Sequence, residues 1–220
     1  MSDVLNYASY LCAGAVILVA NELSASDRQD GLDSLLYAQT VASHKFADSA
    51  DFQSWINASR MAMKTLGGTL FSEPSISFPA PAAGSFTLVD LAQQAMSQLV
   101  SPAAGQALKA KLEVLSQRAS VFPESALLHT LAVQKERWAL FKFGVMSAGV
   151  RTGFGALSFE FDDSVVGNIL NHRFSHEKVI GNVAIGGYKA MVEREDFDLS
   201  RATIISLLGA RREQQIIKLS

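Results

Sequence analysis

The short run from His172 to Glu177 contains the residue types best suited to chemistry. His172 and His176 are four residues apart, so on a helix they would lie one turn apart, as paired zinc ligands do. Asp162 or Asp163 could add a carboxylate, which would fit a metal-dependent hydrolase. The order is not H-E-x-x-H, however, because Glu177 follows the second histidine. We expect a polar turn between two strands here, with a metal site at His172 and His176 as the alternative.

Other catalytic patterns are incomplete. Ser175 and Lys178 match S-x-x-K, but the companion motifs S-D-N and K-T-G of penicillin-recognising enzymes do not occur. Gly149, Gly153 and Gly155 do not fit a phosphate-binding loop, and we expect them to form a turn between strands. The sequence therefore identifies no catalytic residue and no cofactor, and it favours a protein that is not an enzyme.

Composition limits the partners and the compartment. The chain has 220 residues, of which 49% are hydrophobic and 18% charged, with a net charge of -2. A near-neutral balance argues against a nucleic-acid partner, because phosphate binding needs a concentrated basic surface. Cys12 is the single cysteine, so no internal disulfide can form. We expect a cytoplasmic protein, or one exported without a cleavable signal.

The segment Leu11–Ala20 is ten small or apolar residues in a row. A membrane-spanning helix needs about 20 such residues, so this segment is too short. A secretory signal needs a positively charged start, and no lysine or arginine precedes Arg28. We expect a buried first helix. The alternative is a helix that leaves the fold and enters a bilayer or a neighbouring subunit.

Helical spacing dominates the first half of the chain. Apolar residues recur every three or four positions in four stretches, 32–46, 52–66, 88–101 and 102–119. Thr87 with Asp90 resembles a capping box, and Ser101 with Pro102 is a typical helix start. The stretch 69–85 contains three prolines and is expected to be an extended connector with one short edge strand.

A two-residue period replaces this spacing after Arg137. Strands are predicted directly after Arg137 and over 157–162, 165–170 and 179–192, followed by a late helix with Ile204 and a last strand at 216–219. Helices followed by strands indicate an α+β protein, with a helical N-terminal half packed against an antiparallel C-terminal sheet. We divide it into a helical part, 1–123, and a β-rich part, 124–220, which could share one core.

Several short patterns resemble a loose group of uncharacterised bacterial and fungal proteins of similar size. They are the run Leu35–Gln39, then Lys45, Asp48, Phe52, Trp55 and Leu66-Gly67, and later Phe143-Gly144, Gly155-Ala156-Leu157 and Phe159. Gly68 departs from the pattern, where an aromatic residue is expected. The resemblance implies helices before strands and a microbial origin, and it implies no activity.

The leading expectation is a non-enzymatic interaction protein. It would self-assemble as a homo-oligomer, or act in a toxin-like way on a membrane or a host protein, because low charge and glycine-spaced strands favour association. The first alternative is the hydrolase with His172 and His176. The second is a binding module for a small apolar ligand.

Overall fold

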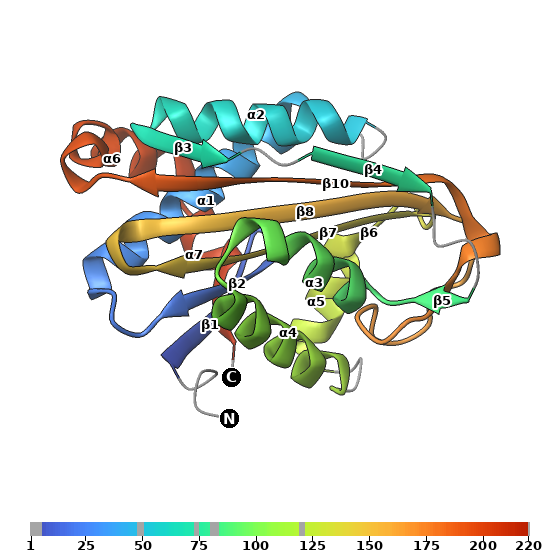
Figure 1. Cartoon of the computed structure of the whole chain (residues 1–220). Coiled ribbons are helices and arrows are strands. Elements are labelled where there is room, and N and C mark those ends of the chain that lie inside the picture. The colour runs from blue at the N-terminus through green and yellow to red at the C-terminus, as the bar shows by residue number, and fades with distance from the viewer. Residues whose placement is uncertain (1–5, 48–50, 73–74, 80–83, 119–121, 220) are drawn as a thin grey trace.

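The protein, seen in a computed structural model that describes residues 6–47, 51–72, 75–79, 84–118 and 122–219, has helices on both faces of a large sheet (Figure 1). Its helices are α1 (Ala25–Lys45), α2 (Phe52–Thr65), α3 (Leu88–Leu99), α4 (Pro102–Ser116), α5 (Pro123–Ala132), α6 (Arg194–Leu208) and α7 (Arg211–Gln215). Its strands are β1 (Tyr7–Cys12), β2 (Ala15–Ala20), β3 (Gly68–Ser72), β4 (Ser75–Pro79), β5 (Ser85–Phe86), β6 (Val133–Gln134), β7 (Trp138–Ser147), β8 (Arg151–Phe161), β9 (Phe174–Ser175), β10 (Val179–Val192) and β11 (Ile216–Leu219). The predicted α+β class is confirmed.

The large sheet has the strand order β11-β1-β2-β7-β8-β10-β3. Strand β4 also pairs with β10, β6 pairs with β7, and β5 and β9 form a separate small sheet. The sheet is mixed: β2 and β7 run parallel, whereas its other described pairs are antiparallel. The β2–β7 pair joins the N-terminal part of the chain to the C-terminal part in one sheet.

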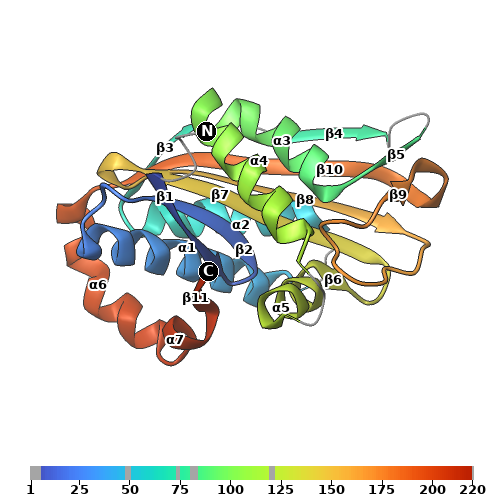
Figure 2. The same cartoon turned by 90° about the horizontal axis from the view of Figure 1, so that it is seen from below.

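Two hydrophobic cores lie on the two faces of this sheet. Helices α3, α4 and α5 cover one face, and helices α1, α2 and α6 cover the other (Figure 2). The first core combines Leu91 with Phe141, and the second combines Leu35 with Tyr188. Each core therefore draws side chains from both sides of residue 123.

The apolar segment 11–20 is not a helix, so the expected first helix is wrong. It contains most of a β-hairpin, in which β1 pairs antiparallel with β2. Ala13 and Gly14 form the two-residue loop with positive φ angles of 48° and 81°, as a hairpin turn of the primed type requires. Val16 faces one core and Ile17 the other. A strand buried on both faces has a continuous run of apolar residues in its sequence. The spacing of apolar residues alone cannot distinguish such a strand from a buried helix.

The predicted helix starts at α3 and α4 are confirmed. The Thr87 side chain accepts a hydrogen bond from the backbone of Asp90, whose carboxylate accepts one from the backbone N–H of Thr87. The Ser101 hydroxyl accepts a bond from the backbone N–H of Ala104, and Pro102 occupies the first turn. Local side-chain chemistry therefore sets both starts.

The strand predicted over 165–170 is wrong, because these residues form an irregular loop that ends in a turn at 169–170. Gly167 has a φ angle of 88°, and the Asn168 side-chain amide donates to the carbonyl of Leu115, at 2.6 Å. These two features end the extended conformation and attach the loop to the end of α4.

Candidate functional site

The two histidines that the sequence paired have different surroundings. His172 Nε2 lies 3.3 Å from Asp163 Oδ2, and its ring packs edge-on against Phe174 at 4.6 Å between centroids. His176 begins a short 3-10 turn, where its backbone N–H donates to the carbonyl of Gly84. Across the described residues, no three His, Cys, Asp or Glu side chains gather closely enough to hold a metal ion. The metal-dependent hydrolase has no further support from this geometry.

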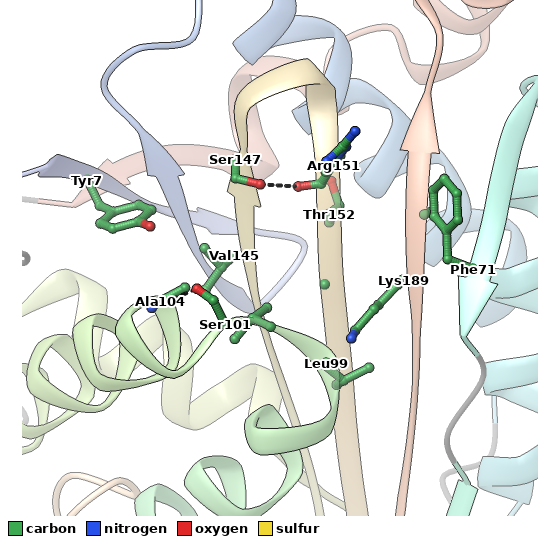
Figure 3. A pocket seen from close by; sticks show the side chains of 13 residues that line it. Tyr7, Phe71, Leu99, Ser101, Ala104, Val145, Ser147, Arg151, Thr152 and Lys189 are labelled. Atoms are coloured by element: carbon green, nitrogen blue, oxygen red, sulfur yellow. Dashed lines mark hydrogen bonds between the residues drawn. The ribbon is translucent and has the colours of Figure 1, made fainter.

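A pocket of about 450 Å³ opens instead at the junction of α3 and α4 with the sheet (Figure 3). This volume lies in the range of small-molecule sites. Strands β7, β8 and β10 form one wall, and residues 99–104 form the opposite wall. Its lining residues are Tyr7, Phe71, Leu99, Val100, Ser101, Ala104, Val145, Ser147, Arg151, Thr152, Gly153, Lys189 and Ala190.

Glycines let the end of α3 lie directly on the sheet beside this pocket. A Cβ atom on Gly153 would come within 2.6 Å of the backbone oxygen of Leu99 and 2.5 Å of a Val100 methyl group. A Cβ atom on Gly187, in the neighbouring strand, would come within 2.9 Å of the Leu99 side chain. The expectation that Gly153 and Gly155 form a turn is therefore wrong, because both lie inside β8. Gly149 does lie in the turn between β7 and β8, with a φ angle of 68°.

The depth of the pocket is apolar and its rim carries positive charge. Leu99 and Val145 are both 2% exposed and supply apolar surface. Arg151 is exposed at the start of β8, and Lys189 is partly exposed on β10. In Figure 3 the Lys189 side chain extends from β10 across β8 toward Leu99. No carboxylate occurs among the described lining residues, so the local potential is positive.

This arrangement suits a ligand with two chemically different ends. Apolar walls stabilise a hydrocarbon group through its removal from water, while lysine and arginine bind a carboxylate or phosphate through charge-assisted hydrogen bonds. The side chain of Phe71, which is 58% exposed, extends the apolar surface beyond the pocket. The site can therefore hold an amphipathic anion without any covalent step.

No motif in the sequence predicts this site. Arg151 and Lys189 are brought close by the β8–β10 register, in which Lys189 lies opposite Gly153 and Met191 opposite Arg151. The signal available in the sequence was a lone lysine, Lys189, within the apolar stretch 183–192. Its meaning depends on the strand pairing, which the sequence does not specify.

Among the described residues, no helix combines the length and the apolar character needed to cross a membrane. The segment 11–20 is accounted for as buried hairpin strands.

Comparisons with known proteins are sparse. No protein-family model matches the sequence. No curated protein matches it. Among solved structures, one titled "DELTA-ENDOTOXIN" is similar with a TM-score of 0.45, 8% sequence identity and 81% of each chain covered. Another, titled "Structure of the Evf virulence factor", is similar with a TM-score of 0.34 and 9% identity, covering 93% of this chain and 82% of that chain. Likeness at these levels transfers no activity to this protein.

Proposed function

We propose that this protein acts by binding rather than catalysis, and that its ligand is an amphipathic anion held in the pocket between β8, β10 and the α3–α4 junction. The observation that carries the proposal is the combination of apolar walls with Arg151 and Lys189 and no described carboxylate in the lining. A fatty acid or a lipid phosphate has the matching chemistry. The ligand could be a free molecule or part of a membrane surface, and the exposed Phe71 ring beside the pocket would contact acyl chains in the second case.

Calorimetric titration with decanoate and with the uncharged 1-decanol tests the free ligand. We expect one decanoate per chain, weaker binding of decanol, and an increase of about tenfold or more in Kd when Lys189→Met removes a charge-assisted hydrogen bond. Lys64→Met is the matched control, because Lys64 is exposed on α2 in the opposite helical layer. Equal binding of decanoate by wild type and Lys189→Met would contradict the assigned head-group site.

Sedimentation with vesicles tests the membrane source. Phosphatidylglycerol vesicles should bind the protein more strongly than phosphatidylcholine vesicles, and Lys189→Met and Phe71→Ser should each weaken that binding. Vesicles loaded with a fluorescent dye extend the test to the toxin-like action that the sequence favours, since release of the dye would report damage to the bilayer. A protein that binds neither decanoate nor either vesicle would overturn the proposed function.

Self-association is a second candidate, favoured by the outer face of α6. Leu199 and Leu207 are 89% and 58% exposed, and their spacing of eight residues places them on nearby faces of the helix two turns apart. A second copy of the chain would cover this stripe in a homo-oligomer. Light scattering should then give a mass above 23.7 kDa for wild type and a monomer for Leu199→Glu. A monomeric wild-type protein would remove this candidate.

A further inference from the structure

A second cavity, of about 620 Å³, lies beside the β1–β2 turn. The C-terminal end of α1, the β1–β2 turn, α5 and α7 surround it. Its lining combines apolar residues such as Leu131 and Leu140 with polar ones that include Gln39 and Lys142. These two residues are only 1% and 6% exposed, so buried polar groups border the cavity.

Lys142 is a buried amine with few partners. Its Nζ donates a hydrogen bond to the carbonyl oxygen of Ala13 in the hairpin turn, and it lies 5.6 Å from the centroid of the Trp55 ring. An ammonium group has three donors, and no described carboxylate lies within ion-pair distance of this one. Burial lowers its pKa to about 8. A buried cation is normally paired with an anion, so this amine lacks the partner that its charge requires.

Gln39 supplies a buried acceptor without a donor. Its side-chain nitrogen donates to the carbonyl oxygen of Cys12, at 3.0 Å, while its side-chain oxygen is buried and makes no hydrogen bond. A buried acceptor in this state costs about 1–3 kcal/mol. Gln39 and Lys142 donate to the carbonyls of consecutive residues, Cys12 and Ala13, so both side chains meet the hairpin turn. The wall of the cavity thus contains one acceptor without a donor and one amine without an anion.

We propose that this cavity binds a small organic acid bearing a hydroxyl or amino group next to its carboxylate, with the carboxylate on Lys142 and the hydroxyl or amine on Gln39. A hydroxy acid places an acceptor and a donor on adjacent carbons, which matches the two neighbouring side chains. Arg211, exposed on α7 and lining the same cavity, adds positive charge near its entrance. This proposal is independent of the amphiphile pocket, which shares none of these residues.

Matched pairs of acids test the proposal by titration calorimetry at pH 8.5. Glycolate and malate should bind at least tenfold more tightly than acetate and succinate, which lack the hydroxyl donor. Binding should also take up protons from the buffer, because a carboxylate beside Lys142 favours its charged form. Titration in two buffers of different ionisation enthalpy measures that uptake.

Variants separate a ligand site from a purely structural lysine. Lys142→Met should abolish both binding and proton uptake, and Gln39→Leu should remove the preference for glycolate over acetate while binding to Lys142 persists. Lys64→Met should change neither. If Lys142→Met does not fold, Gln39→Leu and the proton uptake of wild type still decide the question. Failure of glycolate and malate to bind, binding without proton uptake, or equal affinity for glycolate and acetate would each overturn the proposal.

Discussion

Replacing Lys142 with methionine should change how stability depends on pH. The wild-type amine has a pKa of about 8 in the folded protein and 10.5 as an exposed lysine, because burial disfavours its charged form. Between these values the unfolded chain binds more protons than the folded one, so the free energy of unfolding of wild type rises with pH. The full difference between the two pKa values corresponds to about 3 kcal/mol in the free energy of unfolding. About 1 kcal/mol of this increase occurs between pH 7 and pH 9.

Urea denaturation at pH 7, 8 and 9, with no organic acid in the buffer, measures this effect. The free energy of unfolding of wild type minus that of Lys142→Met should increase by about 1 kcal/mol across this range. The buried Cys12 thiol, whose pKa is raised to about 12, has the opposite trend above its ordinary value of 9.0. Removing Lys142 raises the pKa of this thiol further, so the folded thiol stays protonated up to pH 9 in both proteins and its trend cancels in the difference.

The pH slope is a cleaner reporter than stability at one pH. Methionine also removes the hydrogen bond to the Ala13 carbonyl, which destabilises the variant by an amount that does not depend on pH. Lys64→Met, at an exposed lysine, should give a flat difference. A flat difference for Lys142→Met as well, or one that falls as pH rises, would refute the assignment of Lys142 as a desolvated amine.

Three further predictions concern stability. Arg212→Met should destabilise the fold by about 3 kcal/mol, because it leaves the buried Asp33 carboxylate without the arginine that binds it at 2.8 Å; a loss below 1 kcal/mol in urea denaturation would contradict this. Gly153→Ala should lower Tm, since its Cβ would approach the Leu99 backbone oxygen to 2.6 Å, and an unchanged Tm by calorimetry would show that α3 can move away from the sheet. Thr87→Ala should cost about 1 kcal/mol through loss of the α3 cap, and chemical denaturation that detects no change would remove the capping box as a source of stability.

Helix positions were predictable where the signal is local. The capping box at Thr87 and the proline start at Pro102 depend on residues within one turn, and the structure has both. Helix α1 follows the predicted apolar spacing over 32–46, although it starts earlier, at Ala25, with Ser24 as its N-cap. Such features need no knowledge of the rest of the chain.

The N-terminal hairpin was missed because its strands are buried on both faces. Residues 11–20 have no alternation between apolar and polar side chains, and the Ala-Gly turn at 13–14 lacks the Asn-Gly or Asp-Gly pair that most clearly marks a hairpin. Its parallel pairing with β7 joins residues more than 120 positions apart, such as Ala15 and Lys142. Nothing within the segment specifies that neighbour.

Both cavities were missed for a related reason. Arg151 and Lys189 stand on different strands, and Gln39 and Lys142 lie on a helix and a strand far apart in sequence. Tertiary packing alone brings each pair together. By contrast, the His172 and His176 run was found because its residues are close in sequence, and the fold uses His172 as a partner of Asp163 and Phe174.

Binding of an amphipathic anion in the pocket beside Arg151 and Lys189 is tested most directly by methyl NMR spectra recorded during titration with decanoate. Leu99 and Val145 line that pocket, and Leu131 lines the other cavity. We predict saturable shifts for the Leu99 and Val145 methyl groups, none for Leu131, and much weaker shifts in Lys189→Met at the same decanoate concentration. Unshifted Leu99 and Val145 signals at saturating decanoate, or shifts confined to Leu131, would contradict the account.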